Sequence, residues 1–160
     1  MYKIGENVMY PKEGACYVSD IVTKEINHQE QKYYELMVIF NSSLKISIPV
    51  KNANKIGVRR VINEGEINKL IQDIDKSNDI WVLDRKERFK LYDKKLKSGN
   101  TFEIIRLIKM LVIQNSEKKL CSTDKDFLVK AQKFALSELA ATQCKSYESV
   151  LKEMSEHILN

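Results

Sequence analysis

Basic side chains are concentrated in one short stretch of the sequence, where they could bind phosphate groups. Seven of the 13 residues from 85 to 97 are lysine or arginine, and only Glu87 and Asp93 are acidic, so this window carries a net charge of +5. The whole chain of 160 residues also carries +5. Such a concentration is typical of proteins that bind an anionic partner, most commonly nucleic acid. The alternative is a charged helix face that only contacts water.

The spacing of these residues predicts a helix with two different sides. At about 100° per residue, Phe89, Tyr92 and Leu96 fall within about 60° of one another and form an apolar stripe. Four lysines fall within about 80° of one another on another side of the helix: Lys86, Lys90, Lys94 and Lys97. A row of this kind is suited to following a phosphate backbone. Lysine outnumbers arginine 22 to 5 in the chain. This ratio favours phosphate contacts over the reading of base edges, and it predicts DNA binding with little sequence preference.

No other group of residues has the spacing of a catalytic or metal site. The two histidines, His28 and His157, lie in a polar segment and near the end of the chain, and we expect both on the surface. Cys16, Cys121 and Cys144 form no CxxC pair, and we expect them to be buried apolar side chains. Neither a phosphate-binding glycine loop nor a calcium loop is present. The sequence therefore predicts a protein that is not an enzyme and that has no metal or other cofactor.

Residues 1–63 have the pattern of a small antiparallel β-sheet or barrel. This part contains both prolines and three of the five glycines. Short runs rich in β-branched and aromatic residues alternate with polar turn segments, and the last run alternates apolar and polar residues. The runs are NVMYP, ACYVSDIVTKEI, KYYELMVIF and LKISIPV.

Residues 64–160 have the pattern of a bundle of about five helices. This part contains no proline, and apolar residues recur at helical spacing, beginning with Ile67, Leu70 and Ile74. The basic helix is expected over 84–98, with Gly99 as its stop. Three further helices are expected to begin near residues 101, 122 and 147. No apolar run reaches the roughly 20 residues that span a bilayer, and the start lacks a secretory signal, so we expect a cytoplasmic protein.

Six segments of the chain follow one another in the order found in a known family. They are GENVMYPKEGA at 5–15, SIPVKNA at 47–53, GVR at 57–59, RFK at 88–90, KLKSGN at 95–100 and LVKAQ at 128–132. This set resembles the CarD-like (CdnL) bacterial transcription regulators over nearly the whole chain. The resemblance implies an α+β fold, with a Tudor-like β-barrel that docks on the β-subunit lobe of bacterial RNA polymerase. It also implies a helical domain that contacts promoter DNA at the upstream edge of the transcription bubble.

The resemblance assigns roles to particular residues. On the polymerase side, Lys24 matches a basic contact position and Ile26 lies close by. Ser47 falls on a second contact position, which is usually arginine. On the DNA side, the family's basic contact positions match Arg88, Lys90 and Lys125, and the lysine stripe adds Lys86.

The family's wedge against the opened minor groove requires a tryptophan that this sequence lacks at the matching position. That position is Arg85, and the only tryptophan is Trp81, one helical turn earlier. Trp81 either replaces the wedge or packs in the core, between Ile80 and Val82.

The sequence as a whole predicts a monomeric transcription regulator, associated with the nucleoid through RNA polymerase, that stabilises the open complex. Its barrel, residues 1–63, is expected to bind polymerase, and its helical domain, residues 64–160, is expected to bind promoter DNA through the phosphate backbone and the minor groove. Two alternatives remain from other functional classes. One is a Tudor-like protein-interaction module whose lysines only confer solubility, and the other is a free-standing nonspecific DNA-binding protein.

Overall fold

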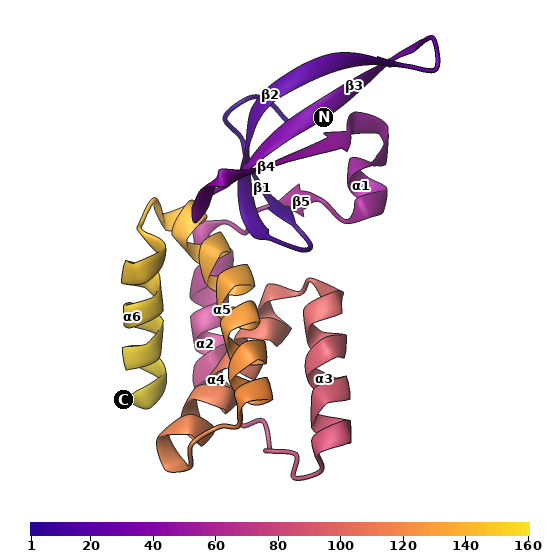
Figure 1. The fold of residues 1–160 in the computed structure, drawn as a ribbon. Coiled ribbons are helices and arrows are strands. Elements are labelled where there is room, and N and C mark those ends of the chain that lie inside the picture. The colour runs from indigo at the N-terminus through magenta and orange to yellow at the C-terminus, as the bar shows by residue number, and fades with distance from the viewer. The chain divides into compact units, whose positions relative to one another are not determined.

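The computed structural model describes residues 1–160 and divides into two compact units, Met1–Val61 and Ile62–Asn160. The first is an antiparallel sheet and the second is made of helices, which confirms the α+β class (Figure 1). Ile62 belongs to the second unit because its backbone N–H donates to Glu138 Oε1 at 2.9 Å and its carbonyl accepts from Thr142 Oγ1 at 2.7 Å.

Unit 1 is a five-stranded antiparallel sheet with the strand order β4-β3-β2-β1-β5. Its core contains Val8, Val18, Tyr34, Leu36 and Ile48, all of which are almost completely buried. The elements are β1 (Asn7–Tyr10), β2 (Gly14–Ile26), β3 (Gln29–Val38), β4 (Asn41–Pro49), the 3-10 helix η1 (Val50–Asn52), α1 (Ala53–Ile56) and β5 (Arg59–Arg60). All four expected apolar runs form strands.

The β2–β3 hairpin extends beyond the rest of the sheet (Figure 1). Pairing between β3 and β4 ends at Tyr33↔Pro49, whereas pairing between β2 and β3 continues to Ile26↔Gln29. Asn27 and His28 connect the strands with φ values of 54° and 61°. These are the left-handed conformations that a two-residue type I′ turn requires. The end of the hairpin is thus a two-stranded ribbon.

Unit 2 contains five helices, as the spacing of apolar residues predicts. They are α2 (Glu64–Lys76), α3 (Arg85–Ser98), α4 (Thr101–Glu117), α5 (Ser122–Gln143) and α6 (Tyr147–Leu159). Helix α4 contributes to the core of this unit, since Ile104, Ile105, Leu107 and Leu111 are inaccessible to solvent. None of the helices is both long and apolar enough to cross a membrane.

Polar caps and a glycine set the ends of α3 and α4. The Asp84 side chain accepts a hydrogen bond from the Glu87 N–H, which begins α3, and Gly99 ends it in the left-handed conformation at φ 63°. The Asn100 side chain accepts from the N–H groups of Phe102 and Glu103 and begins α4. Such caps satisfy N–H groups that have no partner within the helix. The stop predicted at Gly99 for the basic helix is confirmed.

The cysteines and histidines follow the expectations only in part. Both histidines are exposed, and Cys16 is buried, which raises the pKa of its thiol to about 12. The expectation for Cys144 is wrong, because this residue is exposed and ends α5 as a left-handed C-cap at φ 52°. Cys121, just before α5, is only partly buried.

The strained cap at Cys144 leads to a stability prediction. The left-handed conformation costs a residue with a Cβ atom about 1 kcal/mol, whereas glycine adopts it without this cost. Cys144→Gly should therefore raise the free energy of unfolding by about 1 kcal/mol in urea denaturation. Cys144→Ala keeps the Cβ atom and should give no gain. An equal gain from both variants would mean that loss of the thiol, and not relief of the backbone, is responsible.

Candidate binding surfaces

The apolar stripe predicted on α3 packs against α5, and the lysines lie on the other side. Tyr92 is completely buried, and the rings of Phe89 and Tyr92 lie 5.8 Å and 5.1 Å from that of Phe127 in α5. The four lysines of the stripe, Lys86, Lys90, Lys94 and Lys97, are all exposed. The rotation of α3 therefore presents a row of ammonium groups to solvent.

Two lysines of this row are partly neutralised within α3. Lys90 Nζ lies 3.3 Å from Glu87 Oε1, and Lys97 Nζ lies 2.6 Å from Asp93 Oδ2. Lys86 and Lys94 form no ion pair within the protein. The strongest attraction for an external anion is thus expected at these two residues, because no internal carboxylate competes for them.

Arg88 is not on this surface, contrary to the DNA contact expected for it. Its side chain is buried, and Nε and Nη2 donate to Asp124 Oδ1 and Oδ2 at 2.9 and 3.1 Å. Nη1 donates to the carbonyls of Val82 and Leu83 at 2.9 and 3.1 Å. These bonds engage all three guanidinium nitrogens inside the protein, so Arg88 has no pair of free donors for a bidentate contact with a phosphate. Its role is to hold α5 and the loop before α3 in place.

Asp124 is the acceptor at the centre of this buried cluster. Besides Arg88, it accepts from Tyr92 Oη at 3.0 Å and from Cys121 Sγ at 2.9 Å. Burial opposes the charged carboxylate, but the hydrogen bonds from Arg88, Cys121 and Tyr92 outweigh it and hold the pKa of Asp124 below its usual value. Burial, together with the bond to Asp124, raises the pKa of Tyr92. The cluster therefore contains a charged carboxylate at neutral pH.

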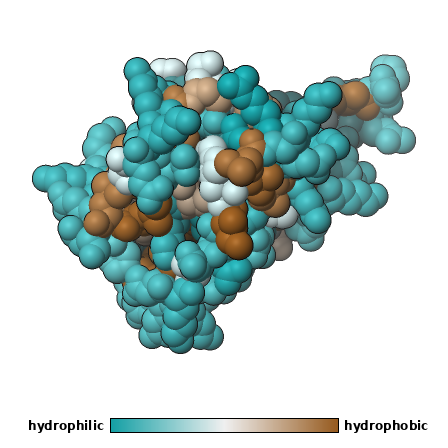
Figure 2. All heavy atoms as spheres, turned by 90° about the horizontal axis from the view of Figure 1, so that it is seen from below, coloured by the Kyte–Doolittle hydropathy of each residue, from teal (hydrophilic) through white to brown (hydrophobic).

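The loop between α2 and α3 places Trp81 beside Arg88. The guanidinium carbon lies 4.5 Å from the centroid of the Trp81 ring, and the ring is partly buried. Ile80 and Leu83 are 83% and 87% exposed. The alternative in which Trp81 packs in the core therefore gains no support from Ile80. Figure 2, which views the molecule from the side on which this loop lies, shows apolar patches on an otherwise hydrophilic surface.

The remaining DNA candidates lie near the start of α3 and of α5. Arg85, the first residue of α3, is exposed, and Lys125 is partly exposed. Sequence reasoning missed Leu83, Lys118 and Lys119. Lys118 and Lys119 follow α4, are exposed and line the same cleft as Trp81 and Arg85. The adjacent lysines after the helix were a usable signal, although nothing in the sequence connects them with Trp81.

The three candidates of unit 1 share the outer face of the sheet. Side chains alternate between the faces of a strand, and the core-facing residues of β3 include Tyr34 and Leu36. The register pairs Lys24 with Gln31 and Ile26 with Gln29 on the opposite face, and it pairs Ser47 with Glu35. Lys24, Ile26 and Ser47 therefore lie on one side of the sheet, on strands β2 and β4, which flank β3.

Glu35, which sequence reasoning missed, joins Lys24 to Ser47. Lys24 Nζ donates to Ser47 Oγ at 2.7 Å, Ser47 Oγ donates to Glu35 Oε1 at 2.8 Å, and Lys24 Nζ lies 2.9 Å from that oxygen. The hydrogen bonds from Lys24 and Ser47 lower the pKa of Glu35. The Lys24 side chain still keeps 43% of its exposure. The network therefore fixes an ammonium group that remains accessible to an anionic partner.

Comparison with known proteins connects these two surfaces with one family. Residues 68–155 match the family model "CarD, C-terminal domain", and residues 2–62 match "CarD-like/TRCF RID domain". The chain belongs to the CarD family. The chain is also 27% identical to a Bacillus subtilis (strain 168) protein named "Putative transcription factor YdeB". The 139 aligned residues cover 87% of this chain and 90% of that protein. The resemblance noted in the sequence is thus confirmed. The family is one of transcription regulators, and its RID domain implies an interaction with RNA polymerase.

The buried cluster of this CarD-family protein leads to a second stability prediction. Arg88→Ala should lower the free energy of unfolding by about 3–5 kcal/mol, because it leaves the Asp124 carboxylate buried without its cationic partner. Lys90→Ala, an exposed change on the same helix, should stay within about 0.5 kcal/mol of the unchanged protein. Urea unfolding followed by tryptophan fluorescence measures both. Equal costs for the two variants would contradict the structural role of Arg88.

The same cluster predicts how stability depends on pH. Because the pKa of Asp124 is lower in the folded than in the unfolded chain, its contribution is present at neutral pH. That contribution is lost as the pH falls below about 4, the ordinary value for an aspartate, and through the lower folded pKa. Asp124→Asn should therefore make the stability of unit 2 less dependent on acid over this range.

Proposed function

We propose that this protein binds the β-subunit lobe of RNA polymerase through unit 1 and promoter DNA through unit 2, and that it thereby stabilises the open complex. The DNA contact is proposed at the upstream edge of the transcription bubble. One observation carries the proposal: α3 buries its aromatic side against α5 and presents its lysine row to solvent. No catalytic step is part of this function, and we propose a monomer that is not an enzyme.

On the polymerase side, the proposed contact is the outer face of the sheet around Lys24. The ammonium group is held by Ser47 and Glu35, so less side-chain freedom is lost on binding. Ile26, 46% exposed near the end of the hairpin, adds apolar area next to the charge. Because Ser47 stands at a position that is usually arginine, Lys24 is the principal cation of this surface. Lys45 adds a second positive charge, and its Nζ lies 3.6 Å from Glu35 Oε2.

On the DNA side, the proposed contacts are phosphate contacts of the exposed lysines. Lysine is a compact charge without the planar donor fork that reads guanine edges, so affinity should depend little on sequence and strongly on salt. Lys86 and Lys94 are the strongest candidates, followed by Lys90, Arg85 and the partly exposed Lys125. Arg88 contributes by holding α3 and the loop in place.

Weak DNA contacts suffice for this function, because unit 1 keeps unit 2 bound to polymerase. Tethering turns DNA binding into an intramolecular step with a high effective concentration. A protein shifts an equilibrium only by its difference in affinity for the two states, and a difference of about 1.4 kcal/mol shifts it tenfold. Contacts made only with partly melted DNA would therefore lengthen the lifetime of the open complex.

The polymerase contact can be tested by removing the charge of Lys24. Lys24→Gln keeps a donor for Ser47 but loses the ammonium group, and it should weaken binding to purified polymerase about tenfold, mainly by loss of electrostatic attraction. Lys32→Gln is the matched control, since Lys32 pairs with Thr23 and lies on the opposite face of the hairpin. Equal binding by both variants in a titration would assign the polymerase contact to another surface.

The DNA contact can be tested on the two unpaired lysines of α3. Lys86→Ala with Lys94→Ala should shorten the open-complex lifetime and reduce the salt slope of DNA binding by about 2, at roughly 0.9 per lost phosphate contact. Circular dichroism should change little, because alanine favours helices.

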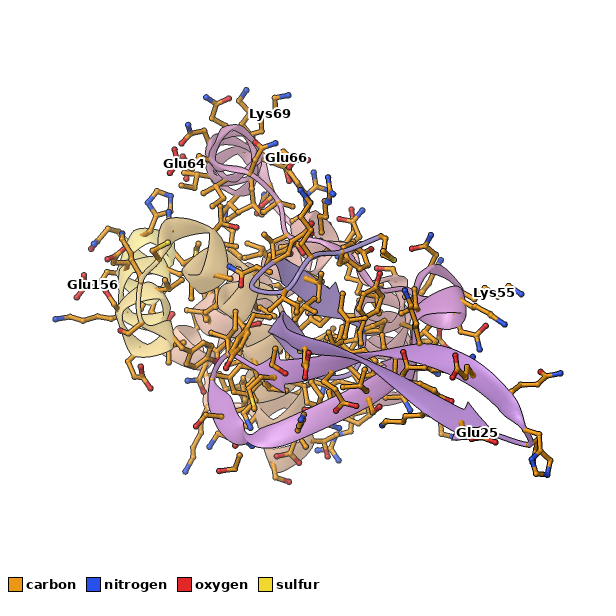
Figure 3. All side chains as sticks on the ribbon, turned by 90° about the horizontal axis from the view of Figure 1, so that it is seen from above. Glu25, Lys55, Glu64, Glu66, Lys69 and Glu156 are labelled. Atoms are coloured by element: carbon orange, nitrogen blue, oxygen red, sulfur yellow. The ribbon has the colours of Figure 1, made fainter.

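The control is Lys69→Ala with Lys152→Ala, which removes the same charge from α2 and α6. Lys69 points outward from α2 (Figure 3), and Lys152 is 78% exposed. If the α3 variant keeps the full lifetime at every salt concentration, its lysines only contact water, and the protein-interaction module becomes the better account. DNA binding without any polymerase binding would favour the free-standing DNA-binding protein.

A further inference from the structure

A second concentration of basic residues lies in unit 1, outside the surface proposed for polymerase. Residues 50–61 contain two lysines and two arginines but no acidic residue, so this stretch carries a net charge of +4. It forms η1, α1 and β5. Neither the face around Lys24 nor the lysine row of α3 includes any of these residues, so their charge has no role in the proposed function.

The two lysines of this stretch are free, whereas its arginines are used within the protein. Arg60 Nε lies 2.8 Å from Glu6 Oε1, and Arg59 Nη1 donates to the carbonyl of Arg60 at 3.0 Å. Lys51 and Lys55 are exposed, and neither forms an ion pair within the protein. Because no internal carboxylate competes for them, these two lysines attract an external anion most strongly.

The helical turns of η1 and α1 place both lysines on the side of the sheet opposite to Lys24. Val50 and Ala53 pack into the core of unit 1, so η1 and α1 cover the core-facing side of the sheet. Lys51 and Lys55 are four residues apart, or about one helical turn, which makes them neighbours on the surface. Figure 3 shows the Lys55 side chain pointing outward from α1.

The turn after β1 adds a third free lysine beside α1. Gly57 ends α1 in the left-handed conformation at φ 96°, and a Cβ atom at this position would lie 3.1 Å from Pro11 Cγ. This close approach brings the turn that contains Lys12 next to the end of α1. Lys12 is exposed and forms no ion pair within the protein. Together, Lys12, Lys51 and Lys55 form the α1 surface.

The polar character of the α1 surface favours nucleic acid over an acidic protein as its partner. Protein–protein interfaces have an apolar centre that is rich in aromatic residues and poor in lysine. Within residues 50–61 the one large apolar side chain that is exposed is Ile56, at 38%. Asn52 and Asn54 are exposed too, and their amide groups can donate to phosphate oxygens. Lysines together with amides are typical of surfaces that contact a phosphate backbone.

We propose that the α1 surface is a second contact for the phosphate backbone of duplex DNA, made by unit 1 independently of α3. Lysines bind phosphates without reading base edges, so this contact depends on salt and little on sequence. The α1 surface and the face around Lys24 lie on opposite sides of the sheet, so unit 1 can hold polymerase and DNA together. The inference goes beyond the proposed function, which gives unit 1 polymerase alone.

The test measures binding of the full chain, without polymerase, to a labelled duplex of mixed sequence over a series of salt concentrations. Lys51→Gln with Lys55→Gln removes two charges and keeps side chains of similar shape. This variant should raise the dissociation constant at least about tenfold at low salt and reduce the salt slope by about 2, at roughly 0.9 per lost phosphate contact. Circular dichroism should change little, because both side chains are exposed.

The matched control is Lys69→Gln with Lys152→Gln, which removes the same charge from α2 and α6. It should change the dissociation constant less than about twofold, because neither lysine belongs to a proposed contact. An affinity and a salt slope that stay unchanged in the Lys51 and Lys55 variant overturn the proposal. A loss no larger than that of the control overturns it as well, because only the net charge of the chain is then responsible.

Two further measurements separate this contact from α3 and from an acidic protein. In a chain that already carries Lys86→Ala with Lys94→Ala, the Lys51 and Lys55 changes should lower the slope by about 2 more, since distant contacts add. If only the α1 changes act, the α3 contact fails and this inference stands. If the Lys51 and Lys55 changes abolish binding to poly-glutamate but leave duplex binding intact, the α1 surface serves an acidic protein and the inference is overturned.

Discussion

The buried ion pair between Arg88 and Asp124 is the interaction on which the basic surface of unit 2 depends. A charge without a partner inside a protein is very unfavourable, so each of these residues requires the other in place. The pair joins α3 to the start of α5, and the remaining guanidinium donors hold the carbonyls of Val82 and Leu83. It thereby sets the rotation of α3 and turns Lys86 and Lys94 to solvent. The same guanidinium holds the indole of Trp81.

Unit 1 uses a buried carboxylate in a similar way. Glu35 lies on the outer face of the sheet, yet it is only 7% exposed, and it anchors Lys24 both directly and through Ser47. In unit 1 the carboxylate binds the surface cations Lys24 and Lys45 directly, whereas in unit 2 it binds the buried Arg88, which holds α3. Cationic side chains that are already held in place lose less conformational entropy when they bind a partner.

Periodicity and capping residues in the sequence predicted the five helices, the four main strands and the two sides of α3, since these depend on neighbours within a few residues. The direction of Arg88 could not be predicted in this way, because its partner lies 36 residues further along the chain. Periodicity treats arginine as polar and places it with the lysines. Glu35 was hidden inside an apolar run for a similar reason. Cys144 was misjudged because its backbone ends a helix.

The central claim is that α3 contacts promoter DNA while unit 1 is bound to polymerase. The most direct measurement is hydroxyl-radical footprinting of a purified polymerase–promoter complex with and without this protein. The account predicts added protection confined to the upstream edge of the melted region, at promoters of unrelated sequence. An unchanged footprint at that edge, under conditions in which the protein is demonstrably bound to polymerase, would contradict it.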